Sequence, residues 1–594
     1  MTASPDISGN ILKGIPVSPG ITLGKAHLVD RSKVKILYQY LIDENQLNAE
    51  IERFQNAVAV TEEQLETLKG RMPEEVKQHA FILDSHLMIL KDSMLCESTA
   101  RKIKEEKINA EWALKKSFHE IEKIFSRIDD EYISSRIQDV ESVTERILRN
   151  LSGDTQESLA EIKERVIIVA HDLSPADTSE LNVSKVMGFI TDVGGRTSHT
   201  AIMAQSLEIP AIVGLESATL TIAEGDLLIV DGNTGDVIIN PDDSGIIYYQ
   251  EKQLQHEKYK SSIARTSHLP AETPDGYRMT IKANIEFLEE VAAVRNHGAE
   301  GIGLYRTEFL YLRSGVLPSG QELFDDYREV VELMAPEPVT LRTLDLGGDK
   351  FASGIEIANE VNPALGLRAI RLFLKKKELF KTQLRAILRT SIYGNVRLMF
   401  PMISGLQEVL DATEVLNDVK RELEKEEILY DENMLVGIMI EIPSAVVISD
   451  LLAQHVDFFS IGTNDLIQFA LAIDRVNEHV AFMYQPFHPA ILRMIRQVVQ
   501  EARKAGIQVS LCGEMAGDPL CIPILLALGL DELSMNARAI PMIKNIIRSI
   551  SLEEARRDFD RVIRLNTARE VRAYLLKRMK KLIPELDEKG YLRS

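Results

Sequence analysis

The run Val436-Gly437-Ile438-Met439-Ile440-Glu441 has the composition that decides the fold of the second half of the chain. A short unbroken apolar run of this kind is typical of a strand that is buried on both faces. Seven further strand-like runs lie between residues 279 and 535, separated by segments with helical character. They are Met279–Asn284, Gly301–Arg306, Val339–Leu344, Val396–Phe400, Phe458–Gly462, Val509–Cys512 and Glu532–Met535. Eight strands that alternate with helices predict a (β/α)8 barrel.

The residues at the carboxyl ends of these runs are candidates for a functional site, because such barrels carry their chemistry there. The ends hold Arg306, Arg342, Glu441, Asn464 with Asp465, and Cys512, and Arg475 follows the sixth run. Each residue also has a structural interpretation. An arginine can satisfy a neighbouring carboxylate, a glutamate can cap a helix, and a cysteine is commonly a buried structural thiol. Their joint position on one rim favours the functional interpretation.

The chemistry of these side chains suits a small and highly anionic substrate. Arg306 and Arg342 present planar forks that match carboxylate or phosphate, and Arg475 is a candidate for a third. Glu441 and Asp465 suit Mg²⁺, which prefers few protein ligands and completes its shell with water and substrate oxygens. The rim therefore predicts a site for a molecule that carries both phosphate and carboxylate groups.

The first part of the chain alternates between two kinds of pattern. Residues from Leu12 to Val29 suggest short strands and turns. Helical periodicity runs from about Ile36 to Leu151, and strand-like runs then return between Val166 and Ile239. The simplest topology is one α/β domain whose chain leaves early, forms a subdomain of antiparallel helices and comes back. A charged helix from about Ile247 to Arg265 leads to the barrel.

His199 stands in the segment Gly194–Met203, GGRTSHTAIM, which has the residues that a phosphoryl group needs. The two glycines allow close backbone approach, Arg196 can pair with an anion, and Thr197, Ser198 and Thr200 offer hydroxyl donors. The helix expected from Ala201 turns its N-terminal amides towards this segment. Imidazole is also a competent nucleophile near neutral pH. A capped helix start with a buried histidine is the structural alternative, but the segment favours a phosphorylated histidine.

Composition narrows the class of protein. The chain has 594 residues, which predicts three or four domains. Its formal charge of −21 argues against a nucleic-acid partner, because the phosphate backbone would be repelled. Its three cysteines form no CxxC pair, so neither a disulfide framework nor a zinc site is indicated. We see neither a signal peptide nor a membrane span, and therefore expect a cytoplasmic protein.

Five strings together resemble Enzyme I of the bacterial phosphoenolpyruvate-dependent sugar phosphotransferase system, and the resemblance covers nearly the whole chain. The strings are GGRTSHTAIMAQSLEIPAIVG at 194–214, GIGLYRTEFL at 301–310, LRTLDLGGDK at 341–350, DFFSIGTND at 457–465 and LCGEMAGD at 511–518. The resemblance implies a multidomain α/β protein, in which a swivelling phosphohistidine domain with an inserted helical subdomain precedes the barrel. The expected boundaries are 1–35 and 152–245 for the phosphohistidine domain, 36–151 for the helical subdomain, 246–272 for the linker, and 273–594 for the barrel and dimerisation domain.

The resemblance also implies the reaction. His199 attacks the phosphorus of phosphoenolpyruvate and becomes phosphorylated on its distal ring nitrogen. Arg306, Arg342, Asn464, Asp465 and Arg475 hold the substrate, Glu441 and Asp465 bind Mg²⁺, and Cys512 protonates the enolate to give pyruvate. The phosphoryl group then passes to the carrier protein HPr, which docks on the helical subdomain. The segment Ala80–Leu90 matches that docking region, with Phe81, Leu83, Leu87 and Leu90 interpreted mainly as bundle core and His86 as a candidate contact. The barrel is expected to form a homodimer.

Two positions depart from the family pattern. Gln205 stands where arginine is usual after the phosphohistidine, and Val476 stands where glycine is common. Loss of a cation near the phosphohistidine is expected to weaken its stabilisation, although Gln205 still donates hydrogen bonds. Val476 is expected to stiffen or shift the loop that carries Arg475.

Three other functions remain as alternatives. The same chemistry can feed a regulatory, nitrogen-type phosphorelay instead of sugar uptake. A pyruvate phosphate dikinase or phosphoenolpyruvate synthase would need an additional ATP-binding domain, for which the chain has no room. A non-catalytic regulator that binds the carrier is disfavoured, because His199, Arg306, Arg342, Glu441, Asp465 and Cys512 are all present.

Overall fold

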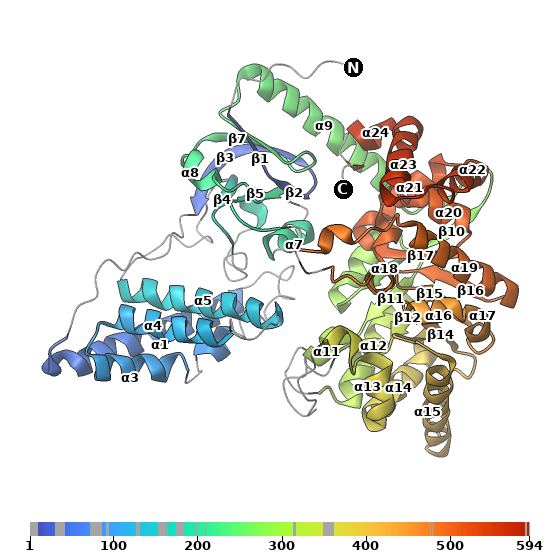
Figure 1. The fold of residues 1–594 in the computed structure, drawn as a ribbon, viewed down its shortest axis with the longest axis horizontal. Coiled ribbons are helices and arrows are strands. Elements are labelled where there is room, and N and C mark those ends of the chain that lie inside the picture. Colours follow the sequence, from blue (N-terminus) through green and yellow to red (C-terminus); the bar gives the residue numbers. More distant parts are fainter. Residues whose placement is uncertain are drawn as a thin grey trace. The chain divides into compact units, whose positions relative to one another are not determined.

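A computed structural model describes most of the chain, and its elements are labelled in Figure 1. The described residues are 10–29, 42–71, 86–90, 94–125, 131–152, 162, 164–173, 183–195, 199–207, 209–312, 317–347, 362–475, 477, 479–588 and 591–592. The chain divides into two compact units, Met1–Glu257 and Lys258–Leu592. Helix α9 (Asp243–Arg265) crosses this division, at the position where the sequence predicts a linker.

The first unit contains a mixed sheet of eight strands in the order β1-β8-β7-β3-β4-β5-β6-β2. The strands are β1 (Asn10–Lys13), β2 (Ile15–Ser18), β3 (Ile21–Val29), β4 (Val166–Ala170), β5 (Val186–Thr191), β6 (Ala211–Val213), β7 (Leu227–Asp231) and β8 (Asp236–Ile239). Strands β3 and β4 are parallel neighbours, with Lys25 opposite Val166, although the whole helical subdomain lies between them in the sequence. The chain therefore does leave the α/β domain early and return to it, as the sequence predicts.

Helices of this unit form two groups. The short helices α7 (His199–Ser206) and α8 (Ala218–Thr221) belong to the α/β domain. The helical subdomain contains α1 (Leu47–Arg71), α3 (Cys96–Glu106), α4 (Ala110–Phe125) and α5 (Glu131–Ser152). Its core includes Phe54, Leu65, Leu114 and Ile147, which are 2% exposed or less. Because these apolar residues recur at helical spacing, each helix buries one face in a common core.

A network around Arg53 joins three of these helices. The Arg53 guanidinium on α1 donates to Glu111 of α4 at 2.8 Å and to the carbonyl of Leu151 on α5 at 3.0 Å. It also pairs with Glu50 one turn earlier on α1. Burial alone would lower the pKa of Arg53, but its two carboxylate partners outweigh this and raise the pKa, so the residue stays charged.

The second unit is a closed barrel of eight parallel strands, surrounded by helices (Figure 1). Its strands are β10 (Arg278–Ile285), β11 (Ile302–Arg306), β12 (Val339–Arg342), β13 (Val396–Phe400), β14 (Leu435–Ile440), β15 (Phe458–Ile461), β16 (Gln508–Leu511) and β17 (Glu532–Asn536). Each strand pairs in parallel with the next, and β10 closes the ring by pairing with both β11 and β17. All eight predicted runs are confirmed as barrel strands, with ends that differ by at most two residues. The short β9 (Ala271–Glu272), which pairs antiparallel with β10, was not predicted.

Helices follow the strands and cover the barrel. They are α10 (Val291–Asn296), α11 (Glu308–Leu312), α12 (Gly320–Met334), α13 (Ala369–Lys375), α14 (Lys377–Thr390), α15 (Leu406–Lys425), α16 (Pro443–Val447), α17 (Ser449–Leu452), α18 (Thr463–Leu471), α19 (Pro489–Ala505), α20 (Ile522–Leu528), α21 (Ile540–Ser549), α22 (Leu552–Val562), α23 (Ala568–Leu582) and α24 (Pro584–Glu588). The main apolar core lies between these helices and the strands. Since successive strand residues face opposite sides, the other set of side chains fills the barrel interior.

The amino-terminal end of the barrel interior holds a buried ionic cluster. Lys282 of β10 is 1% exposed and donates to both carboxylate oxygens of Glu532 at 2.7 Å. Arg397 of β13 donates to the same carboxylate at 3.1 Å. Glu532 is the first residue of β17 and Arg397 is the second of β13. The two cations thus satisfy both oxygens of one carboxylate.

Candidate active site

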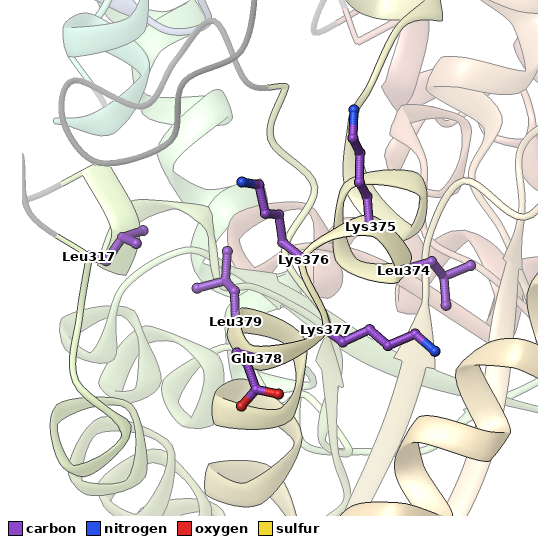
Figure 2. Close-up of a pocket in the computed structure, with 7 residues that line it drawn as sticks. All are labelled: Leu317, Leu374, Lys375, Lys376, Lys377, Glu378 and Leu379. Carbon is purple, nitrogen blue, oxygen red and sulfur yellow. The ribbon is translucent and has the colours of Figure 1, made fainter.

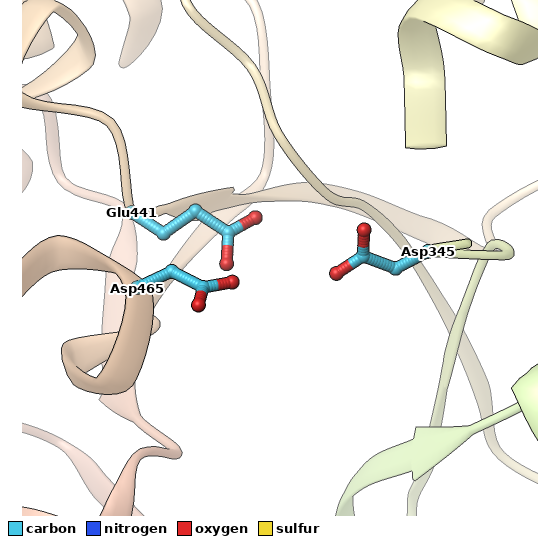
Figure 3. Close-up of side chains that lie close together, drawn as sticks. All are labelled: Asp345, Glu441 and Asp465. Carbon is cyan, nitrogen blue, oxygen red and sulfur yellow. The ribbon is translucent and has the colours of Figure 1, made fainter. Parts of the chain in front are cut away.

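Three carboxylates converge at the opposite, carboxyl-terminal end of the barrel. Asp345 follows β12, Glu441 follows β14, and Asp465 lies in the first turn of α18 (Figure 3). One oxygen of each lies within 4.8 Å of the others. Carboxylate oxygens gathered in this way suit a hard divalent cation such as Mg²⁺. The sequence predicted Glu441 and Asp465 here but did not predict Asp345.

Glu441 is the most deeply buried of the three carboxylates. Its side chain accepts the backbone N–H of Met402 at 2.6 Å, and Met402 has a φ of 57° in the left-handed region. Gly462 lies against it, since a Cβ atom there would stand 3.0 Å from Glu441 Oε2. Burial, together with the nearby Asp465 and Asp345, raises the pKa of Glu441 to about 8. A cation bound here would stabilise the ionised form of Glu441 and so offset the causes that raise its pKa.

Arg342 and Asp345 form a buried network beside this cluster. Arg342 is 8% exposed and donates to Glu308 at 2.8 Å, and its Nη1 lies 3.2 Å from Asp345 Oδ2. Burial alone would lower the pKa of Arg342, but Glu308 and Asp345 raise it, so the guanidinium is charged. The Arg342 Nε–H is buried without a hydrogen-bond acceptor among the described residues. This donor is therefore available to a ligand that binds at the rim.

Asp345 is also held by a second arginine. Arg368 donates to Asp345 Oδ1 from Nε at 3.0 Å and from Nη2 at 2.8 Å, and its Nη2 lies 3.7 Å from Asp465 Oδ2. Both oxygens of Asp345 therefore already face arginines. Glu441 and Asp465 are consequently the better candidates for metal ligands, and Asp345 orients the two guanidinium groups.

The remaining predicted substrate-binding residues also have carboxylate partners. Arg306 is ion-paired with Glu286. Arg475 donates to Glu514 at 3.0 Å, and Asn464 donates to the same oxygen at 3.2 Å. Thus each of the three predicted arginines is paired with a glutamate or aspartate.

Cys512 lies in the barrel interior, directly after β16. It is 2% exposed and packs with Leu304, Met399, Met439 and Phe458. The hydroxyl of Ser460 lies 3.2 Å from its sulfur. Burial raises the pKa of the Cys512 thiol, so the sulfur carries its proton near neutral pH. A protonated thiol in a dry interior is suited to give a proton to a carbanion.

The charges at this rim do not balance. The described residues bring four arginines (306, 342, 368 and 475) together with six carboxylates (286, 308, 345, 441, 465 and 514). A highly anionic substrate would meet net repulsion from this set. A divalent cation restores the balance, and for this reason the donor set fits a metal ion that binds with the substrate.

The structure brings Arg306, Arg342, Glu441, Asn464, Asp465, Arg475 and Cys512 to one end of one barrel, as the sequence predicts. Sequence reasoning missed Asp345, Glu308, Arg368, Glu286 and Glu514. Asp345 carried a usable signal, because it stands three residues after Arg342 within the LRTLDLGGDK string. Glu308 and Glu514 carried a similar signal, because they stand two residues after Arg306 and Cys512 within their own strings. Arg368 and Glu286 lie outside the five strings, and their ion pairs are not visible in one sequence.

The predicted nucleophile belongs to the first unit. His199 is the first residue of α7, two residues before the predicted helix start. Thr200 is 2% exposed and donates to the carbonyl of Leu173 at 3.3 Å. Gly194 has a φ of 111°, a conformation that suits glycine, and a Cβ atom on Gly214 would stand 3.2 Å from its carbonyl oxygen. Arg196, Thr197, Ser198 and Val476 lie outside the described residues, as do the side chains of His199 and Gln205.

The expectation for the carrier-docking segment needs a correction. His86 is 2% exposed, so its ring is part of the packed interior and not of a contact surface. On the same short segment Met88 is 74% exposed. Leu90 is 4% exposed and belongs to the bundle core, as predicted. Residues 80–85, including Phe81 and Leu83, lie outside the described residues.

A separate hollow of about 540 Å³ lies where α13 meets α14. Its lining includes Lys375, Lys376 and Lys377, whose side chains point in different directions (Figure 2). The hollow contains none of the predicted site residues. It is therefore not a candidate for the active site.

Comparisons with known proteins define first a class and then a family. Three family profiles match: "PEP-utilising enzyme, N-terminal" at 13–136, "PEP-utilising enzyme, mobile domain" at 162–235 and "PEP-utilising enzyme, PEP-binding domain" at 260–552. The chain is thus an enzyme of the phosphoenolpyruvate-utilising class. It is 44% identical to the phosphoenolpyruvate-protein phosphotransferases of Bacillus sp. (strain S) and Bacillus subtilis over 565 residues, which cover 95% of this chain and 97% and 99% of theirs. The Haemophilus influenzae protein of that name is 41% identical over 94% of this chain and 98% of its own. The chain belongs to the phosphoenolpyruvate-protein phosphotransferase family.

Within the described part of the chain, no helix combines the length and the apolar character that a membrane span requires.

Proposed function

We propose that the chain takes the phosphoryl group of phosphoenolpyruvate onto His199 and passes it to the carrier HPr, releasing pyruvate as the first step of a sugar phosphotransferase system. The observation that carries this proposal is the charge pattern of the barrel rim. Paired arginines adjoin three converging carboxylates whose oxygens suit a divalent cation, and a buried thiol lies close to them. This combination suits a substrate with both phosphate and carboxylate groups.

Arg306, Arg342, Asn464 and Arg475 hold the anionic oxygens of the substrate. The guanidinium groups offer forked donors, and the free Nε–H of Arg342 is available to one of these oxygens. Asp465 contributes to binding through its place beside Asn464. Glu441 and Asp465 would hold Mg²⁺, which supplies neutralisation of substrate charge when it is bound.

The proposed chemical step uses residues of both units. A ring nitrogen of His199 forms a bond to phosphorus, and the phosphorus–oxygen bond to the enolate oxygen breaks. The electron pair stays on that oxygen, and the resulting enolate takes the Cys512 proton at carbon, leaving the thiolate. Because His199 and the substrate site belong to different units, the reaction requires the units to approach each other and then to separate.

Labelling with phosphoenolpyruvate tests the assignment. Full-length protein incubated with labelled phosphoenolpyruvate and Mg²⁺ should yield an acid-labile, base-stable phosphoprotein, and His199→Ala should remain unlabelled. ATP should not label either protein. Labelling of His199→Ala, or labelling by ATP alone, contradicts the proposed route.

The carrier is proposed to dock on the helical subdomain near the exposed Met88. Because the phosphoryl donor site lies in the other unit, Met88→Glu should raise the KM for HPr severalfold without changing phosphorylation of His199 by phosphoenolpyruvate. An unchanged KM for HPr would remove this surface from the docking site.

The regulatory alternative keeps the same chemistry. Measuring phosphoryl transfer to each HPr-like protein of the genome distinguishes it from sugar uptake.

The barrel is also proposed to form a homodimer, and the protein to act in the cytoplasm. Exposed apolar side chains on this unit, such as Phe482 at 75% and Val447 at 68%, support an association surface. Phe482→Glu should shift the sedimentation coefficient towards the monomer. A dimer that persists in this variant would place the interface elsewhere.

A further inference from the structure

Glu514 is a rim residue that the proposed reaction leaves without a role. It begins the short helix η10 (Glu514–Gly517), one residue after Gly513 and two after Cys512. The segment lies close to the preceding strand end, since a Cβ atom on Gly513 would overlap Thr463 Oγ1 at 1.9 Å. The side chain of Glu514 is 71% exposed. The ion pairs of an exposed glutamate usually contribute little to stability. The contacts of Glu514 therefore call for a functional explanation.

Among the described residues, the side chains hydrogen-bonded to Glu514 are those of Arg475 and Asn464, both of which are proposed to bind the substrate. Its Oε1 accepts from Arg475 Nη1 at 3.0 Å and from Asn464 Nδ2 at 3.2 Å. Its backbone N–H donates to Asn464 Oδ1 at 2.8 Å, which fixes the orientation of that amide. One carboxylate oxygen thus receives the same two donors that a substrate oxygen requires.

We propose that Glu514 is an internal competitor of the substrate. Its carboxylate holds Arg475 and Asn464 in position while the site is empty, and then yields their donors to the incoming anion. The exchange is possible because Glu514 is exposed, so that water solvates the displaced carboxylate. Glu514 therefore weakens substrate binding and favours release of the product. The proposal rests on the proposed function, since it takes phosphoenolpyruvate as the ligand.

Two substitutions distinguish an effect of the direct contact with Arg475 from an effect of the negative charge alone. Glu514→Gln keeps the shape but removes the charge, whereas Glu514→Asp keeps the charge but withdraws it by one methylene from Arg475. If Glu514 competes by contact, both variants should bind more tightly than the wild type. Loss of one exposed ion pair corresponds to about a two- to fivefold change. The readouts are the Kd for oxalate, a small dianion, by calorimetry with Mg²⁺ present, and the KM for phosphoenolpyruvate.

A matched control is available on the outer surface of the barrel. Glu426 pairs with Arg385 and is exposed, so Glu426→Gln removes one carboxylate of the same unit without touching the rim. This variant should retain the wild-type values. The Kd for Mn²⁺ alone should also stay constant in the Glu514 variants, because Glu514 is not one of the three converging carboxylates.

The outcomes divide clearly. Equal or weaker oxalate binding by Glu514→Gln overturns the proposal and makes Glu514 a support for Arg475. Tighter oxalate binding by Glu514→Gln but not by Glu514→Asp also overturns the proposal. In that case the loss of one negative charge near the site explains the result without a direct contact. If the wild type takes no phosphoryl group from phosphoenolpyruvate but both variants bind oxalate more tightly, the transferase assignment fails and the role of Glu514 stands.

Discussion

The two ends of the barrel interior contain the same kinds of side chain in different proportions. At the amino-terminal end, Lys282 and Arg397 satisfy both oxygens of Glu532. At the carboxyl-terminal end, four arginines accompany six carboxylates. Each end has one guanidinium N–H that is buried without an acceptor among the described residues, on Arg397 and on Arg342 respectively. The first end is complete in the sense that both oxygens of its carboxylate accept from cations. The second end is incomplete, because its carboxylates outnumber its arginines and leave room for a cation. Charge balance therefore distinguishes the two roles better than burial does.

Glu441→Gln tests the incomplete end and has the largest expected effect. Removing this carboxylate should lower phosphorylation of His199 by about 10²–10³-fold, the magnitude for loss of one charge-stabilising group. The folded protein should lose little stability without metal near neutral pH, since the raised pKa of Glu441 means that Gln replaces a protonated, uncharged carboxyl group. Rapid-quench labelling and urea unfolding measure the two quantities. A variant with full activity would remove Glu441 from the proposed metal site.

Glu532→Ala tests the complete end. Two buried cations lose their shared partner, which should cost about 3–5 kcal/mol of unfolding free energy. The KM for phosphoenolpyruvate should remain near the wild-type value, because the cluster faces away from the rim. Denaturant unfolding and steady-state kinetics at a temperature where the variant is folded measure these effects. A changed KM with unchanged stability would reverse the roles assigned to the two ends.

Cys512→Ala tests the thiol that lies in the interior between these ends. Loss of a general acid should slow pyruvate formation by about 10²-fold. Stability should change little, since Ala removes only the buried sulfur. Pyruvate release is followed with a coupled dehydrogenase, with Cys521→Ala as the control for a buried thiol elsewhere. Equal rates in the two variants would exclude Cys512 as the proton donor.

The pH dependence of stability has the smallest expected effect. Because the pKa of Glu441 is raised from its usual value of 4.5 to about 8, the folded protein without metal holds this proton more tightly than the unfolded chain. The stabilisation is present below the unfolded pKa and is lost as the pH rises towards 8. Saturating Mg²⁺ should therefore raise the melting temperature more at pH 8 than at pH 5.5. Glu441→Gln should abolish this difference, and persistence of the difference would assign it to another group.

The sequence predicts the barrel well for a physical reason. Parallel strands are buried on both faces, so the eight runs stand out as short segments rich in apolar residues, although some contain a charged residue such as Arg397. The residues at the strand ends follow from the same pattern. Arg368 was missed because it reaches the site through side-chain pairing, which leaves no periodic pattern in the sequence. Glu514 was missed although it stands two residues after Cys512, because its ion pair with Arg475 is visible only in the structure. His86 was misjudged because a histidine on a helix carries no sign of which face is buried.

The parallel pairing of β3 with β4 has a consequence for synthesis of the chain. Lys25 and Val166 are neighbours in the sheet, so β3 has no parallel partner until about 140 further residues have left the ribosome. At ordinary translation rates this interval is on the order of ten seconds. The helical subdomain emerges complete within that time and can fold first, while the early strand waits as an unpaired edge. The order of emergence thus makes the inserted helices the first part of the first unit to fold. A nascent chain halted before residue 166 has left the ribosome should already protect the amides of these helices from exchange.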